Sequence, residues 1–155
     1  MYDLQEIEAI KRLKYRYVRF LDQKRWDELA ALFTEDAEAS YSSGKYAFSG
    51  RDQIMEFLRG ALGSHDALTS HRVHEPEIDV TGPTTARGIW GLDDVVIYPK
   101  ADVAVRGAAF YEDEYVKVGG EWRIRRTGYR RLYEEFSSRK DTPSAKITQT
   151  WWQAG

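Results

Sequence analysis

The 155-residue chain contains no cysteine. Disulfide bonds, zinc–thiolate sites and a cysteine nucleophile are therefore excluded. Histidine is scarce as well, with three in the whole chain. No pair of histidines and no cluster of carboxylates falls on one face at the spacing of metal ligands. The sequence accordingly predicts no metal site and no cofactor.

Long apolar runs and a strong excess of one charge are also missing. No apolar run approaches the roughly 20 residues needed to cross a bilayer, and Met1–Glu6 lacks the basic and apolar regions of a signal peptide. A net charge of −2 and a pI near 6.0 argue against nucleic acid as the main partner. We therefore expect a cytoplasmic protein that binds neither membranes nor nucleic acids.

Aromatic residues are abundant, at 14% of the sequence with five Trp and ten Tyr. They suit an aromatic-lined pocket as well as a core, because each ring buries a large area while keeping a polar tip. The length predicts one domain. We expect it to cover residues 1–136, followed by a tail over residues 137–155 that carries Trp151 and Trp152.

The periodicity of apolar residues is helical first and extended later. Intervals of three and four residues predict a helix over Leu4–Asp22 and a second over Trp26–Phe33. A hairpin over residues 36–49 and a third helix after Gly50 follow. The later segments are expected as strands over Leu68–Val80, Thr84–Tyr98, Val103–Val118 and Glu121–Tyr133, with a tight turn at Gly119-Gly120. This order predicts an α+β domain with the helices packed on one face of a long antiparallel sheet.

Alternation along Thr84–Tyr98 places Asp94 on the same strand face as Trp90 and Leu92. Arg87 marks the other face as the solvated one, so Asp94 is expected to point toward the helices. A carboxylate there must be paired, hydrogen-bonded or protonated. It is either a catalytic group or a structural ion-pair partner. The basic residues from Arg123 to Arg131 are interpreted as a solvated sheet face, balanced by glutamates on the neighbouring strand.

His71, at the start of the first long extended segment, and Asp22, at the end of the first helix, form the most informative pair in the chain. A carboxylate can hold an imidazole in one tautomer, and the imidazole can then take a proton from a substrate. The structural alternatives are that Asp22 caps the second helix, that His71 is a satisfied core histidine, and that Tyr17 is a core tyrosine.

Several local motifs together resemble the SnoaL-like branch of the nuclear-transport-factor-2-like superfamily over about residues 4–135. The motifs are Leu13-Lys14-Tyr15-Arg16-Tyr17 with Asp22, His71-Arg72-Val73-His74-Glu75-Pro76-Glu77-Ile78, Ala86-Arg87-Gly88-Ile89-Trp90 with Asp94, Tyr111-Glu112-Asp113-Glu114-Tyr115, and Gly120-Glu121-Trp122-Arg123-Ile124. The resemblance implies a cone-shaped α+β fold that encloses a pocket. Members of this branch include dehydratases, a dehydrochlorinase and polyketide cyclases, and several have no known reaction.

The resemblance also implies a set of site residues. Asp22 and His71 match the central dyad of the dehydratase-like members, Tyr17 matches an assisting polar residue, and Asp94 matches a second acid. Residues expected to contact the substrate are Trp90, Leu92 and Arg126. One departure is that Thr127 stands where the family often has an arginine, five residues after the last-strand Trp122. Arg126 is adjacent, and a bulge would let it substitute.

Two classes of function follow from these expectations. The first is a cofactor-free lyase or isomerase acting on a small, hydrophobic, cyclic substrate, with His71 as the base and Tyr17 or Asp94 as proton donor. The second is a non-catalytic ligand-binding or protein-interaction module on the same fold. A homo-oligomer is expected in either case, because the outer sheet face carries Ile89, Val95 and Ile97. The tail is expected to pack across a subunit boundary or over the pocket mouth.

Overall fold

The structure, a computed structural model, describes residues 3–153. The outermost ends of the expected domain and tail, residues 1–2 and 154–155, lie outside the described part. Three helices and six strands follow one another in the order α1 (Leu4–Asp22), α2 (Trp26–Ala30), β1 (Phe33–Tyr41), β2 (Tyr46–Ser49), α3 (Arg51–Leu62), β3 (Leu68–Gly82), β4 (Thr85–Tyr98), β5 (Val103–Val118) and β6 (Glu121–Ser138). Short 3₁₀ turns lie at Pro99–Ala101 and Arg139–Asp141.

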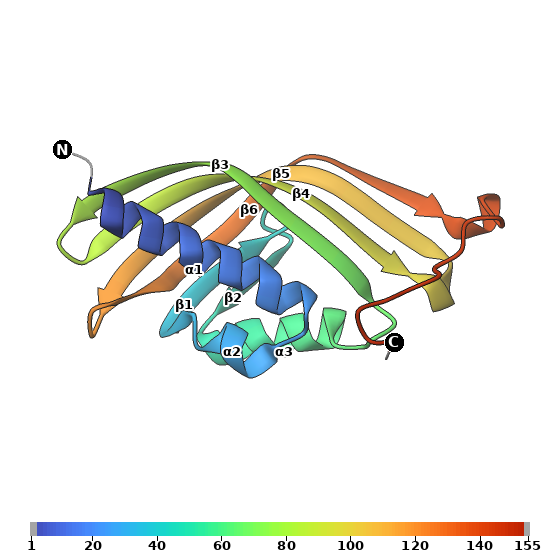
Figure 1. The fold of residues 1–155 in the computed structure, drawn as a ribbon, viewed down its shortest axis with the longest axis horizontal. Helices are drawn as coiled ribbons and strands as arrows, with labels where there is room; N and C mark the ends of the chain where they lie inside the picture. Colours follow the sequence, from blue (N-terminus) through green and yellow to red (C-terminus); the bar gives the residue numbers. More distant parts are fainter. Residues whose placement is uncertain (1–2, 154–155) are drawn as a thin grey trace.

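The strands form one curved sheet in the order β2-β1-β6-β5-β4-β3. Neighbouring strands are antiparallel except β1 and β6, which run parallel. Figure 1 shows α1 lying along one face of the long strands, with α2 and α3 beside β1 and β2. The sheet is curved but does not close on itself. Its inner face and the helices together enclose a cone-shaped interior. This is the predicted α+β fold.

Helix α1 is the element that fills the cone. Asp3 caps its start by accepting from the backbone N–H groups of Gln5 and Glu6, at 3.2 Å each. Its buried face includes Ile10, Leu13 and Phe20, which follow the helical spacing of the sequence. Packing this face against the sheet brings the C-terminal end of the helix, and Asp22 with it, to the start of β3.

Several element boundaries differ from the sequence prediction, most of all at the second helix and at the last strand. The second helix ends at Ala30, and Phe33 begins β1, where it pairs with Ile124 of β6. Tertiary pairing here overrides the local helical pattern. At the other end of the chain, β6 continues to Ser138, because Ser137 and Ser138 pair with the start of β5. The Gly119-Gly120 turn is confirmed, with positive φ at both glycines.

The tail folds back on its own chain. The Trp152 ring stacks on His65 in the α3–β3 connection, with ring centroids 4.3 Å apart and planes 11° apart, and Figure 1 shows the tail returning toward that connection. Trp151, by contrast, is 70% exposed.

No helix within residues 3–153 is both long enough and apolar enough to cross a membrane.

Candidate active site

Asp22 leaves the end of α1 and binds β3 through three hydrogen bonds. Its carboxylate accepts from Thr69 Oγ1 at 2.9 Å, from the His71 backbone N–H at 2.8 Å and from His71 Nδ1 at 2.7 Å. Helix α2 begins instead after Arg25, which makes no side-chain cap. The interpretation of Asp22 as a helix cap is therefore wrong. Its unfavourable place at the C-terminal end of a helix is offset by these bonds to the sheet.

His71 is held by this carboxylate in one orientation. Because Asp22 accepts the other two bonds as well, we assign the proton of the shared bond to His71 Nδ1, which donates to Asp22 Oδ1. The second ring nitrogen, Nε2, has no hydrogen-bond partner within the described residues and keeps its lone pair. The side chain is 10% exposed and lines a cavity. The arrangement can therefore take a proton from a molecule bound in that cavity.

Asp94 is the next acidic group beside His71. The two residues face each other directly across β3 and β4, so their side chains leave the sheet on the same face. Both carboxylate oxygens of Asp94 are bound by Arg131 of β6, with Nη2 donating to Oδ2 at 3.0 Å and Nη1 donating to Oδ1. Asp94 thus points inward as predicted and is paired. Burial lowers the pKa of Arg131, but hydrogen bonds and charge from Asp94 outweigh it and raise that pKa above its usual value.

Gly107 makes the contact between Arg131 and Asp94 possible. It lies on β5 directly opposite Asp94, between the strands that carry the two charged groups. A Cβ atom at Gly107 would lie 2.7 Å from Arg131 Nη1 and 2.6 Å from the backbone oxygen of Tyr133. Because glycine has no side chain, the guanidinium of Arg131 can pass over β5 at this position and reach Asp94.

Arg131 points inward because β6 contains a bulge. Ile124 pairs with Tyr115 and Arg126 with Glu114, so Arg125 is an extra residue on β6. The bulge reverses which later residues face the helices. The sequence prediction that Arg131 lies on the solvated sheet face is therefore wrong, because Arg131 points toward the helices. The sequence does contain a sign of this bulge. Trp122 and Ile124 stand at even positions whereas the later Tyr129 stands at an odd one, so the apolar face changes between them.

The same bulge turns Arg126 away from the cavity. Its guanidinium donates to Glu38 at 2.7 Å and lies 3.7 Å from Glu114, on the outer face of the sheet. The expectation that Arg126 substitutes for the missing family arginine is therefore not met by its position. Thr127 faces inward instead, fully buried.

Thr127 belongs to a buried polar network in the core. It donates to Asp113 Oδ1 at 2.7 Å, and Asp113 Oδ2 lies 2.7 Å from the ammonium of Lys14. Tyr115 also donates to Asp113, at 2.8 Å, and Trp90 Nε1 donates to the Tyr115 hydroxyl at 2.9 Å. Burial lowers the pKa of Lys14, while the charge and hydrogen bond of Asp113 raise it. Sequence patterning did not reveal Lys14, because it lies among the basic residues of α1.

Trp90 and Leu92 are core residues, 0% and 1% exposed. Trp90 is tied to the network described above, and neither residue is part of the cavity wall. Their predicted inward direction is confirmed, but the cavity lies farther toward α3. Tyr17 does line it, at 1% exposure, so the core interpretation and the pocket interpretation both hold for this tyrosine.

The cavity that His71 lines has a volume of about 230 Å³. Seven of its 16 lining residues are aromatic: Tyr17, Tyr41, Tyr46, Phe57, Tyr98, Tyr111 and Tyr129. The hydroxyls of Tyr17 and Tyr41 lie 3.1 Å apart, and burial raises the pKa of both well above the usual tyrosine value. They are therefore neutral groups able to donate hydrogen bonds. Within residues 3–153, no group of three or more His, Asp or Glu side chains is arranged to hold a metal ion.

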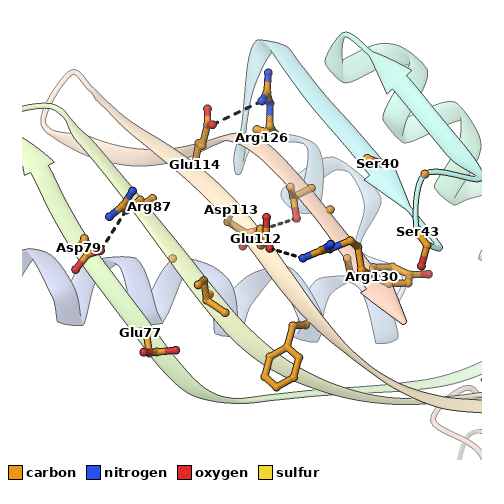
Figure 2. A pocket seen from close by; sticks show the side chains of 17 residues that line it. Ser40, Ser43, Glu77, Asp79, Arg87, Glu112, Asp113, Glu114, Arg126 and Arg130 are labelled. Atoms are coloured by element: carbon orange, nitrogen blue, oxygen red, sulfur yellow. Dashed lines mark hydrogen bonds and ion pairs between the residues drawn. The ribbon is translucent and has the colours of Figure 1, made fainter. Parts of the chain in front are cut away.

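A larger hollow of about 790 Å³ lies on the opposite face of the sheet. Figure 2 shows the ion pairs that line it, Asp79 with Arg87, Glu112 with Arg130 and Glu114 with Arg126. These side chains are more than half exposed and largely neutralise one another. The smaller cavity is the stronger candidate despite its size, because it combines a fixed imidazole, a buried ion pair and neutral hydroxyl donors.

Comparisons with known proteins identify the family and agree with the fold. A family profile described as "SnoaL-like domain" matches residues 3–128. A crystal structure from Novosphingobium aromaticivorans DSM 12444, whose name assigns it to the scytalone dehydratases, is 32% identical with a TM-score of 0.79, covering 86% of this chain and 88% of that one. A hexachlorocyclohexane dehydrochlorinase of the LinA type from Novosphingobium barchaimii LL02 is 18% identical with a TM-score of 0.76, covering 86% of this chain and 91% of that one.

A relative without known function is similar in sequence. An uncharacterised protein of Mycobacterium tuberculosis (strain ATCC 25618 / H37Rv) is 25% identical over 120 residues, which are 74% of this chain and 78% of that protein.

Proposed function

Because the chain belongs to the SnoaL-like domain family, with dehydratase-like and dehydrochlorinase structures among its neighbours, we propose that it is a cofactor-free lyase. Its substrate is a small, hydrophobic, cyclic molecule. The observation that carries the proposal is the bond between His71 Nδ1 and Asp22, which leaves Nε2 as a proton acceptor on a cavity wall.

The proposed reaction is an elimination. His71 Nε2 removes a proton from a substrate carbon, the electron pair of that C–H bond forms a new double bond, and a hydroxyl or halide on the next carbon leaves with its own bonding pair. Asp22 stabilises the imidazolium that forms and keeps the ring oriented. A departing hydroxyl also needs a proton, which Tyr17 on the cavity wall donates and then recovers from the His71 imidazolium, so that both groups return to their starting states.

Asp94 has a different role in this proposal from the acid suggested by its sequence position. Both of its carboxylate oxygens accept hydrogen bonds from Arg131. It therefore holds Arg131 in the cavity wall. Arg131 in turn can donate a hydrogen bond to an oxyanion or leaving anion in the cavity. The residue expected for that task, Arg126, lies on the other sheet face.

Size limits the substrate. A cavity of about 230 Å³ lies below the roughly 300–1,000 Å³ of most drug-sized ligand sites. The proposal therefore favours substrates with one or two rings, such as cyclic β-hydroxyketones or small halocycloalkanes, over four-ring molecules.

The test is an elimination assay on such a panel, following the ultraviolet absorbance of the new double bond or release of halide. Turnover that His71→Ala abolishes and His74→Ala preserves supports the lyase. Ligand binding by calorimetry without turnover of any panel member would instead favour the non-catalytic binding module.

A further inference from the structure

Two carboxylates stand beside the His71 ring, and only one of them is bound to it. Asp22 from α1 takes the proton of Nδ1. Asp94 from β4 is the direct cross-strand neighbour of His71 and lines the same cavity, which places their Cβ atoms about 4.5–5.5 Å apart. Asp94 is buried, at 6% exposure, so water screens its charge little.

A second carboxylate near His71, if its charge were unbalanced, would hinder the histidine from acting as a base. Negative charge within about 4–6 Å of an ionisable group shifts its proton affinity by roughly 1–3 pH units toward the cationic form. A histidine that is already protonated cannot remove a proton from a substrate. The site therefore needs the charge of Asp94 balanced locally.

Arg131 supplies that balance. It binds both oxygens of Asp94, and its side chain is itself only 14% exposed. We propose that Arg131 is a positioning residue that neutralises Asp94, so that Asp22 is the carboxylate that acts on the His71 ring. That this arrangement keeps a base available at neutral pH rests on the lyase function proposed above. The charge balance between Arg131 and Asp94 does not depend on that function.

The other cations around His71 are not placed to do the same. Arg72, next to His71 on β3, is 74% exposed and lies 3.8 Å from Asp22 rather than against Asp94. Lys24, after α1, donates to the backbone oxygens of Leu62 and Ala67. The ammonium of Lys14 is paired with Asp113 in the core network.

The experiment is an NMR titration of the His71 ring in isotopically labelled protein, which requires no substrate. Arg131→Gln should raise the titration midpoint of His71 by about 1–2 pH units relative to the unmutated chain. Asp94→Asn, which leaves Arg131 as an unbalanced cation, should lower it. The double variant with both substitutions should return it close to the original midpoint, and Arg131→Lys should largely preserve it.

Arg130→Gln is the matched control, because Arg130 is the neighbouring residue on β6 but pairs with Glu112 on the outer face. It should leave the His71 midpoint unchanged. An unchanged midpoint in folded Arg131→Gln, or a shift that persists in the double variant, would overturn the inference. If Arg131→Gln fails to fold, the double variant decides the question, because its His71 midpoint should lie above that of Asp94→Asn, and equal midpoints would overturn the inference. Absence of lyase turnover would count against the proposed function alone.

Discussion

Strand β3 carries two histidines, one on each face of the sheet, and each is paired with an aspartate, Asp22 from α1 on the inner face and Asp93 from β4 on the outer face. On the inner face, His71 Nδ1 lies 2.7 Å from Asp22, and the two side chains are 10% and 15% exposed. On the outer face, His74 Nε2 lies 2.8 Å from Asp93, and the side chains are 43% and 64% exposed. The offset of three residues along β3 sends the two histidines to opposite faces.

The two pairs have nearly the same length but different surroundings. Asp22 is fixed by two further hydrogen bonds, from Thr69 and the His71 backbone, and the ring lines a cavity. The His74 ring lies over Gly91 and is open to water, where charges interact weakly and side chains remain free to move. A short bond between histidine and aspartate is therefore not enough for catalysis. Burial, extra bonds to the acid and a cavity distinguish the inner pair.

The largest expected difference between the faces is in turnover. With any substrate of the proposed elimination, His71→Ala should lower kcat by roughly 10²–10⁴-fold with a smaller effect on binding, because a general base acts in the transition state. His74→Ala is the matched change on the outer face. Its kcat should stay within about twofold of that of the unmutated chain, because His74 does not line the cavity. Steady-state kinetics of both variants provide the comparison, and equal losses would contradict it.

The next difference is in stability, at two adjacent residues of β5 that face opposite sides. Asp113→Ala leaves the buried Lys14 without its partner and should cost about 3–5 kcal/mol of unfolding free energy. Glu112→Ala removes only an exposed ion pair with Arg130 and should cost less than about 1 kcal/mol. Urea denaturation measures both, and similar midpoints for the two variants would contradict the prediction.

The Asp113→Ala variant should also gain a characteristic pH dependence. Burial lowers the pKa of Lys14, and loss of Asp113 removes the interactions that oppose this shift. Between the lowered folded value and the ordinary unfolded value, the unfolded chain binds more protons than the folded chain. Stability should therefore rise as pH is raised toward the ordinary lysine range. Denaturation curves at pH 7 and pH 9 test the sign.

Two glycines sharpen the comparison at a smaller scale. A Cβ atom at Gly107, on the inner face, would lie 2.6 Å from a backbone oxygen, whereas a Cβ atom at Gly91, on the outer face, would lie 2.6 Å from the His74 ring. The ring can swing into solvent but the backbone cannot. Gly107→Ala should therefore cost about 1–3 kcal/mol and disturb the Arg131–Asp94 pair, while Gly91→Ala should cost clearly less. Thermal unfolding distinguishes them, and a more damaging Gly91→Ala would refute the explanation.

The smallest expected effect concerns assembly. The outer face exposes Ile89 and Phe110, at 42% and 43%, and we expect a second copy of the chain to cover it. Substituting both residues with Asp should lower the mass seen by light scattering at micromolar concentration without reducing thermal stability of the monomer. Leu4→Asp, at an apolar position on α1 that is 76% exposed, is the control away from this face. A monomeric unmutated chain would show the expectation wrong.

The sequence alone determined the features that depend on local periodicity and local chemistry. The helical spacing that ends at Asp22, the alternation that directs Asp94 and Trp90 to one face, and the turn at Gly119-Gly120 can all be recognised because each depends on residues close together in the chain. The choice of His71 and Asp22 as partners also came from the sequence, through its resemblance to a family.

Only the tertiary structure decided which residues complete the site. The bulge at Arg125 exists because of how β6 pairs with β5, and it exchanges the expected Arg126 for Arg131. The depth of Trp90 and the burial of Lys14 depend on what packs above them, which no local pattern encodes. Pairing between distant strands selects the register, and one added residue reverses the direction of the side chains that follow it up to the next bulge, which on β6 lies at Leu132.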